Sequence, residues 1–331
     1  MFDPYLILAP ALTLAVLALV RFIGCNAIFG LSAVREYGPS PTFTPGPGAV
    51  PQGQGITISA DPGVPIYYTL DGTDPATTAG GSTLLYTGPV PILVATKIRA
   101  IADYNTQELG PSHIAEADYT LQPAFRQVAT KDVVPSSPST VTTDPFLMPV
   151  VQGNTIVVWI WYNSNAATVL NVQDSGGNSY SSAVAPTQGT GLLANYTQEI
   201  WYGVVTNAPG GLTVTANFQG TPFTAKKAIF AHEYEGLNPA GPFEAGNFGQ
   251  GVNAAAGATV ASAPVTTMGL IAFGAGIFSS NGFAAGNFTA RVVTPDGNLS
   301  EDQIPPAMSP VAASFFLPNG GDWLVQVATF K

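Results

Sequence analysis

The sequence predicts a mainly β protein with an N-terminal hydrophobic helix, a small Ig-like β-sandwich and a larger, jelly-roll-like β-sandwich. An uncharged apolar run opens the chain, and from residue 56 onward apolar and polar residues alternate in short segments separated by turn-forming residues. Only 9% of the residues are charged, against roughly 25% in an average soluble domain. The expected boundaries are 1–37 for the helix, 38–55 for a Pro/Gly linker, 56–121 for the small sandwich and 122–331 for the larger one.

The N-terminal segment 5–20 carries no charge, and apolar residues resume after Arg21 as far as Phe29. A helix over 5–29 would exceed the ~20 residues that a bilayer requires. A buried helix of a soluble domain is the alternative, but a helix that is hydrophobic on every side, next to a Pro-rich segment, has little of its own chain to pack against. We therefore predict a transmembrane or assembly helix. Its expected anchor residues are Tyr5, Leu14, Leu17, Arg21 and Phe22.

The one cysteine, Cys25, lies within this apolar region, so an intrachain disulfide cannot form. A secreted domain of this size can be stable on its core alone, and the chain therefore stays compatible with an extracellular location. The segment 22–25 resembles a bacterial lipobox, in which the cysteine is acylated, although Arg21 and the uncharged start of the chain depart from that pattern. The lack of a basic first segment also disfavours a cleaved signal peptide.

Residues 38–55 are rich in Pro and Gly and are expected to form an extended, semi-rigid spacer. From there the period of hydrophobicity becomes two, which predicts half-buried strands over 56–60, 66–70, 97–102 and 115–121. Asp71 and Asp74 fall between two of these strands. Two carboxylates on a turn could bind a calcium ion, but hydrogen bonding within an Asx turn explains them better.

Three motifs in this region carry a family resemblance: IYYTLDGTDPATT, LYTGPVPI and TKIRAIADYNTQELGPSHIAEADYTL. They resemble the chitobiase/β-hexosaminidase C-terminal domain over residues 51–121. The resemblance implies a small β-sandwich that acts as a non-catalytic accessory module, because in such proteins the chemistry belongs to other domains. No catalytic glycosidase domain is visible in the sequence.

The region 122–331 predicts about ten further strands in one sandwich of the jelly-roll kind. Its layout vaguely resembles lectin-like or phage-tail-like sandwich domains, which is an analogy at the level of the fold. The Gly-rich run 245–263 shows weak periodicity, and we expect a surface loop or a close-packed seam between subunits there. The expected strands are 125–128, 156–162, 168–173, a strand at 180, 196–205, 212–218, 228–234, 270–273, 288–294, 312–316 and 323–330.

Aromatic residues give the main candidates for a binding site. Trp159 and Trp161 lie two apart on one expected strand and would share a face, whereas Trp201 and Tyr202 would lie on opposite faces of theirs. Exposed rings could stack on the apolar faces of sugars. The segment around the first two rings is so apolar that core packing is the favoured alternative.

No motif in the sequence indicates catalysis, a metal or a cofactor, and we expect none of the three. His232, Glu233 and Glu235 stand close together in the sequence, but on a strand the histidine and the two glutamates would face opposite ways. Catalysis would require carboxylates from distant strands to converge in a cleft. The candidates for such a cluster are Glu233, Glu235, Asp296, Glu301 and Asp302.

The net charge of −10, with no Lys/Arg cluster, argues against nucleic-acid binding. The favoured function is a non-catalytic, membrane-anchored bacterial surface protein that binds or adheres through its sandwiches, with glycans as candidate ligands. The alternative is a structural subunit of a virion or of an extracellular filament. The expected partners are the lipid bilayer or neighbouring copies, through the N-terminal helix, and a homo-oligomer is compatible with either function.

Overall fold

A computed structural model describes residues 36–331 except 106–108, 134–138, 220–225, 268–269 and 307. The predicted helix and its anchor residues Tyr5, Leu14, Leu17, Arg21 and Phe22 lie outside these residues. Within the described part of the chain the structure is mainly β, as predicted, with one 3₁₀ turn, η1 (Gly191–Leu193). In that part, no helix has the length and apolar character to cross a membrane.

The chain forms two compact units. Of the described residues, the first contains those from 36 to 47 together with Ile56–Val90 and those within 97–118, and the second contains Gly48–Gly55, Pro91–Thr96 and those within 119–331. The strands from residue 36 to residue 121 form a five-stranded sheet of order β3-β10-β8-β5-β6, a three-stranded sheet of order β2-β4-β7 and the pair β1-β9. Their bounds are β1 (Glu36–Tyr37), β2 (Thr42–Thr44), β3 (Gly48–Val50), β4 (Gln54–Ser59), β5 (Ile66–Thr69), β6 (Leu84–Leu85), β7 (Val90–Ile92), β8 (Thr96–Ala102), β9 (Leu109–Gly110) and β10 (Ala115–Leu121).

Alternation sets the core of these strands, as the sequence predicted. Ile56 and Ile58 on β4 are buried, and so are Ile98 and Ala100 on β8, while the residues between them are more exposed. The segment 38–55 was expected to be a spacer, and instead it supplies β2, β3 and the first residues of β4. Strand pairing satisfies its backbone groups, so its high content of Pro and Gly does not prevent short strands from forming.

The remaining strands form two successive sandwiches, whereas the sequence suggested one. The first has the sheets β11-β18-β13-β16-β15 and β12-β17-β14, and the second has β19-β28-β22-β25-β24 and β20-β27-β23, with the extra pair β21-β26. The first is built from β11 (Ala124–Val133), β12 (Thr140–Thr142), β13 (Thr155–Asn163), β14 (Thr168–Asp174), β15 (Tyr180–Gln188), β16 (Tyr196–Val204), β17 (Val214–Gln219) and β18 (Lys227–Glu235). The second is built from β19 (Phe243–Ala254), β20 (Ala258–Ala261), β21 (Val265–Thr267), β22 (Ile271–Phe278), β23 (Phe283–Ala284), β24 (Thr289–Val293), β25 (Leu299–Gln303), β26 (Ser309–Val311), β27 (Ser314–Leu317) and β28 (Gly321–Phe330).

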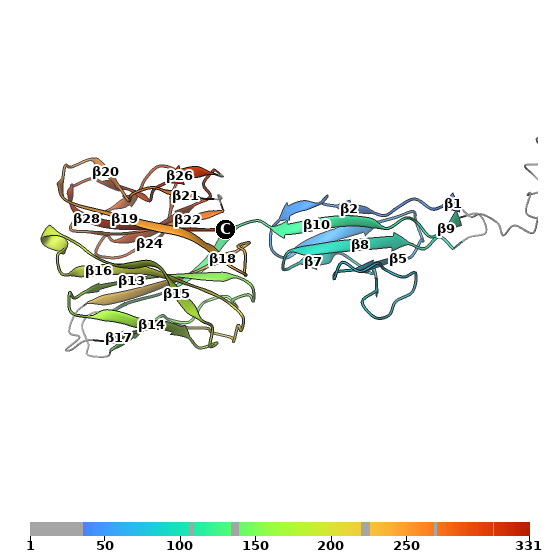
Figure 1. Cartoon of the computed structure of the whole chain (residues 1–331), viewed down its shortest axis with the longest axis horizontal. Helices are drawn as coiled ribbons and strands as arrows, with labels where there is room; N and C mark the ends of the chain where they lie inside the picture. Colours follow the sequence, from blue (N-terminus) through green and yellow to red (C-terminus); the bar gives the residue numbers. More distant parts are fainter. Residues whose placement is uncertain (1–35, 106–108, 134–138, 220–225, 268–269, 307) are drawn as a thin grey trace, which may run out of the picture. The chain divides into compact units, whose positions relative to one another are not determined.

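The two sandwiches have the same topology. In each five-stranded sheet the first strand of the sandwich pairs with its last strand, as β11 does with β18 and β19 with β28. The next strands in the sheet are β13, β16 and β15 in the first sandwich and β22, β25 and β24 in the second. The three-stranded sheets β12-β17-β14 and β20-β27-β23 correspond in the same way. β11 thus corresponds to β19, β13 to β22 and β18 to β28. The four main sheets are stacked, with the two five-stranded sheets in the middle (Figure 1). This part of the chain is therefore a structural duplication packed face to face.

Three hydrophobic cores separate the four layers. The first contains Val158 and Ile160 of β13 and lies between the two sheets of the first sandwich. The second contains Trp159 of β13 and Phe273 of β22, so it joins the two five-stranded sheets. The third contains Phe315 and lies inside the second sandwich. Because β13 belongs to two cores at once, its residues are buried on both faces, and this explains the unbroken apolar run in the sequence.

The Gly-rich run 245–263 contains two strands, β19 and β20, so the prediction of a loop was wrong. Its glycines permit close packing. A Cβ atom at Gly246 would come within 2.7 Å of the Val184 side chain, and one at Gly249 would come within 2.5 Å of the Ala261 carbonyl oxygen. Strands whose partners approach this closely cannot carry side chains at those positions, and without side chains the alternating pattern disappears.

Candidate functional site

The four aromatic residues singled out from the sequence do not form one platform. Trp159 and Trp161 share a face, as predicted, but both are fully buried in the core between the five-stranded sheets. Trp201 packs on the opposite face of its sheet from Tyr202, again as predicted. The alternative of core packing therefore describes the first two rings, because β13 lies in the middle of its sheet and is covered on both sides.

Trp201 and Tyr202 are both half-buried, and Tyr202 lines a surface depression. The Tyr202 ring stacks on Phe243 at a centroid distance of 5.4 Å. The depression has a volume of about 320 Å³ and is also lined by Ser181 and Gly241. A binding role for Tyr202 and Trp201 stays a prediction.

A second cleft, of about 380 Å³, combines an aromatic ring with several polar side chains. It opens where β11 of the first sandwich lies near β24 and β25 of the second. We call it the Arg291 cleft. Its lining residues are Pro123, Ala124, Phe125, Ile271, Asn287, Thr289, Arg291, Asp302, Gln303 and Ile304.

The Arg291 guanidinium is held in place from two sides. Its Nε and Nη2 donate to the two carboxylate oxygens of Asp302 at 2.8 and 2.7 Å. Its Cζ lies 4.3 Å from the centroid of the Phe125 ring, which is the geometry of a cation–π contact. Arg291 is half-buried and Asp302 is buried, so the pair is shielded from water and has a fixed orientation.

Asp302 also accepts a hydrogen bond of 2.7 Å from the Tyr234 hydroxyl, which is fully buried. Burial raises the pKa of Tyr234 well above 10, and the neighbouring charge of Asp302 raises it further. The tyrosine therefore stays a neutral donor. With this third hydrogen bond, the carboxylate, the guanidinium and the Phe125 ring form one rigid wall of the cleft.

His232 and Ser300 form a buried pair close to this wall. The His232 Nε2 and Ser300 Oγ atoms are 2.8 Å apart, and His232 Nδ1 is 3.3 Å from the Val157 carbonyl oxygen. Burial lowers the pKa of His232 to about 3, so the ring is neutral. A serine nucleophile requires an accessible hydroxyl and a carboxylate on the far side of the histidine. This pair has a carbonyl there, and both side chains are fully buried.

Of the carboxylates that a catalytic cluster would need, Glu233 and Glu235 both lie beside Arg126, at 3.7 and 2.6 Å, and the others lie on other elements. Glu233 is buried on the opposite face of its sheet from His232, as alternation predicted, and accepts hydrogen bonds from Gln127, Asn154 and the Val151 amide. The other members each bind a separate partner. Glu235 pairs with Arg126, Asp296 with Lys226, Glu301 with the Ser314 amide and Asp302 with Arg291.

The turn that follows β5, before β6, uses its two carboxylates for hydrogen bonding and an ion pair. Asp71 Oδ1 accepts the Thr73 amide at 3.0 Å, which closes the predicted Asx turn. Its pKa is lowered by the hydrogen bonds from Thr73, the side-chain bond first. Asp74 forms an ion pair with Arg99.

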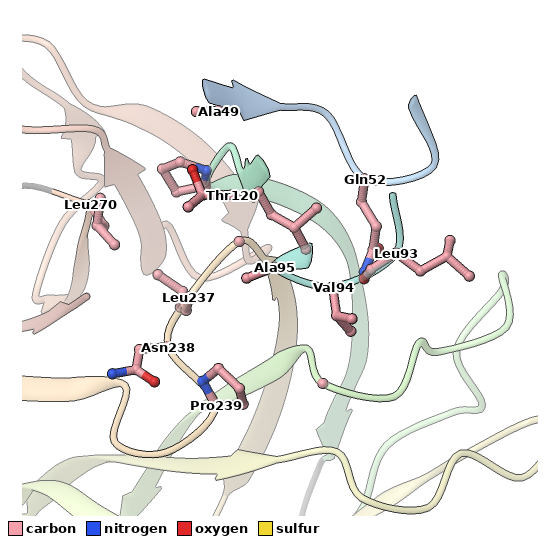
Figure 2. A pocket seen from close by; sticks show the side chains of 14 residues that line it. Ala49, Gln52, Leu93, Val94, Ala95, Thr120, Leu237, Asn238, Pro239 and Leu270 are labelled. Carbon is pink, nitrogen blue, oxygen red and sulfur yellow. The ribbon is translucent and has the colours of Figure 1, made fainter. Parts of the chain in front are cut away.

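An apolar pocket of about 570 Å³ also lies in the second unit, and Figure 2 shows the side chains that line it. Gln52 forms part of its wall: its Nε2 donates to Asn154 Oδ1 and its Oε1 accepts from Arg126 Nη1, both at 3.2 Å. The lining residues include neither an aromatic ring nor a charged group, so the pocket suits an aliphatic group better than a sugar. Among them are Ala49, Leu93, Val94, Ala95, Leu237, Pro239 and Leu270.

Comparison with known proteins gives a family match for part of the chain. A family model described as Fn3 associated matches residues 56–119, which is less than half of the chain. Carbohydrate-binding modules of the β-sandwich superfamily are the subject of one solved structure that aligns with 62% of this chain and 99% of its own, at 11% identity and a TM-score of 0.18. At that TM-score a common fold is not demonstrated. A search of curated proteins gave no match.

The Arg291 cleft was not predicted from the sequence. Its residues come from β11, β22, β24, β25 and the segments beside them, and no motif connects them. Asp302 was named only as a candidate for a catalytic cluster, and Arg291 and Phe125 were not named as site residues. The one usable signal was that Arg291 is one of only ten basic residues in the chain, and a rare charge on an apolar strand points to a partner.

Proposed function

We propose that this protein is a non-catalytic, membrane-anchored surface protein that binds carbohydrate in the Arg291 cleft. The observation that carries the proposal is the rigid wall of Arg291, Asp302 and Phe125 beside the polar side chains of Asn287, Thr289 and Gln303. Sugars present hydroxyl groups and apolar C–H faces together, and a site for them needs fixed donors and acceptors beside an apolar surface.

Charge favours a neutral sugar. Asp302 balances the guanidinium of Arg291 through two hydrogen bonds, so the cleft has no surplus charge from this pair. Asn287 and Thr289 are exposed at the rim, and Gln303 is half-buried. These three side chains can donate to hydroxyl groups and accept from them. A volume of about 380 Å³ lies within the range of small-ligand sites.

A binding measurement tests the proposal. The full-length chain, kept in detergent because of its apolar N-terminal segment, is screened on an array of neutral glycans, and the tightest ligand is titrated by calorimetry. We expect the double variant Asn287→Ala/Thr289→Ala to bind at least tenfold more weakly, a change worth about 1.4 kcal/mol. Both side chains are exposed, so the substitutions leave the core unchanged.

The matched control is Thr266→Ala/Asn319→Ala, which removes the same two kinds of exposed side chain elsewhere in the second sandwich. It is expected to bind like the unmodified chain. The proposal fails if no arrayed glycan binds, or if the cleft variant and the control bind equally well.

The anchoring part of the proposal rests on the uncharged segment 5–20. Replacing Leu14 and Leu17 by arginine would place two charges in this segment, at a cost of about 2.5–3.5 kcal/mol each near a bilayer centre. We expect the variant to move from the membrane to the soluble fraction of lysed cells. An unchanged membrane fraction would refute the anchor.

A further inference from the structure

We infer that the saccharide site continues from the Arg291 cleft onto an exposed pair of phenylalanines, Phe283 and Phe316, so that the protein binds a polysaccharide chain in preference to a single sugar. The inference rests on the proposed function and specifies its ligand. Phe283 belongs to β23 and Phe316 to β27, both in the outer sheet of the second sandwich.

The two phenylalanines are direct neighbours across the sheet. Phe283 and Phe316 are opposite residues in the β23–β27 pairing, and Thr259 of β20 is opposite Phe316 on its other side. Directly opposite residues have their side chains on one face, with Cβ atoms about 5 Å apart. The three side chains therefore form a row across the outer face of this sheet.

The rings of this row are in contact with water. Phe283 is 53% exposed and Phe316 is 38% exposed, while Phe315, the next residue, is fully buried in the core. A cross-strand aromatic pair can also serve only to stabilise a sheet. Here the inward face already holds Val260, Phe315 and Leu317, so the core of this sheet does not depend on the outer pair.

The chemistry of this face matches that of the cleft. The outward-facing residues of the three strands are Thr259, Ala261, Phe283, Ser314 and Phe316, and none of them is charged. Two rings flanked by two hydroxyl groups suit the apolar face and the hydroxyl edge of a pyranose. A purely hydrocarbon ligand would leave the hydroxyl groups without hydrogen-bond partners, and a charged ligand would not match the apolar rings.

The chain itself connects the phenylalanine pair to the cleft. Phe283 is four residues before Asn287, a lining residue of the cleft, so their Cα atoms are at most about 14 Å apart. The connecting loop is fixed to the outer sheet, since the Ala285 amide donates to the Ser314 carbonyl oxygen at 2.9 Å. A linear ligand can therefore occupy the cleft and pass directly onto the pair.

Two contact areas for one ligand chain produce a dependence on ligand length. A short saccharide fills the cleft alone, whereas a longer one gains the second area without a second loss of translational freedom. The double variant Phe283→Thr/Phe316→Thr keeps residues that favour strands and removes both rings. Phe248→Thr is the control, because Phe248 is 43% exposed but lies on β19, outside this face.

The experiment compares cellobiose with cellohexaose, and maltose with maltohexaose, on the full-length chain by calorimetry. We expect the pair variant to bind the preferred hexasaccharide at least tenfold more weakly and the corresponding disaccharide with unchanged affinity. Asn287→Ala/Thr289→Ala should weaken the binding of both lengths.

Each other outcome has a distinct meaning. Equal hexasaccharide affinity for the pair variant and the unmodified chain overturns the inference and leaves the proposed function intact. If the rings serve self-association, sedimentation will show a dimer that the pair variant abolishes, with sugar binding unchanged, and this too overturns the inference. Absence of all glycan binding removes the proposed function as well.

Discussion

Glu199 on β16 is a carboxyl group in the core of the first sandwich. It is fully buried, and its hydrogen-bond partners are the hydroxyl of Tyr162 at 3.2 Å and the indole nitrogen of Trp201 at 2.7 Å. Burial raises the pKa of Glu199 from 4.5 to about 7, although both hydrogen bonds act in the opposite direction. The folded protein therefore favours the protonated form of Glu199 at pH values below about 7.

This shift predicts a loss of stability as pH rises. The folded pKa lies above the unfolded one, so the favourable contribution of Glu199 is complete below pH 4.5 and disappears as pH rises through 7. At 1.36 kcal/mol per unit, the loss amounts to about 3 kcal/mol. Glu199→Gln cannot ionise. Its free energy of unfolding should exceed that of the unmodified chain by about 3 kcal/mol at pH 8.5, with a much smaller difference at pH 5, measured by urea denaturation.

Glu301 on β25 provides an internal comparison for this measurement. Burial raises its pKa from 4.5 to about 9, so the same kind of loss continues to a higher pH. The Glu199 variant retains Glu301, and the effect of Glu301 cancels in the difference between the two proteins. A difference that does not change between pH 5 and pH 8.5 would contradict the role assigned to Glu199.

At the scale of single elements, strands could be predicted from the sequence where side chains give a clear hydrophobic pattern. They could not be predicted where glycines replace those side chains. The run at 156–162 is apolar throughout because β13 is covered on both faces, and its strand was predicted almost to the residue. β19 was missed because its glycines contact neighbouring segments closely. The duplication was also hidden, since β13 carries bulky residues where β22, its counterpart, carries Gly and Ala.

The candidate site was harder to predict than the strands for a related reason. Alternation correctly separated His232 from Glu233 and placed Trp159 beside Trp161. It could not show that a third layer covers this face, because that layer comes from a different sandwich. The Arg291 cleft depends on the same packing of one sandwich on another, which a local pattern does not encode.

The glycines of β19 lead to a test at this scale. A Cβ atom at Gly249 would come within 2.5 Å of the Ala261 carbonyl oxygen and 3.0 Å of the Ser262 Cα, both of them backbone atoms. Gly249→Ala should therefore force a backbone shift and cost about 1–3 kcal/mol. Gly241→Ala is the control, because a Cβ atom there meets nothing within 4 Å. Equal urea midpoints for the two variants would contradict the close packing of β19.

At the scale of the whole molecule, the two sandwiches of the duplication are joined by a polar bridge inside their shared core. Gln198 of the first donates to the Leu324 carbonyl oxygen at 3.1 Å, and Gln326 of the second donates to Thr187 and to the Gln198 carbonyl oxygen at 2.9 and 3.1 Å. Each glutamine thus satisfies groups of the opposite sheet. Separating the sheets would leave these polar groups without partners and would expose the apolar residues between them.

This shared core predicts that the two sandwiches unfold together. Of the four tryptophans, Trp159, Trp161 and Trp201 lie in the first sandwich and Trp323 in the second. Trp159 and Trp161 face the core shared with the second sandwich, whereas Trp201 packs against the core inside the first. In a background with Trp159, Trp161 and Trp323 replaced by phenylalanine, the emission comes from Trp201 and therefore reports on the first sandwich alone. Adding Gly249→Ala, which disturbs only the second sandwich, should lower the urea midpoint measured by this emission. The resulting loss in the free energy of unfolding should equal the loss expected for Gly249→Ala by itself, about 1–3 kcal/mol. If the emission midpoint stayed where it was while the second sandwich lost stability, the two halves would be independent domains, and the core between them would contribute little to the stability of either.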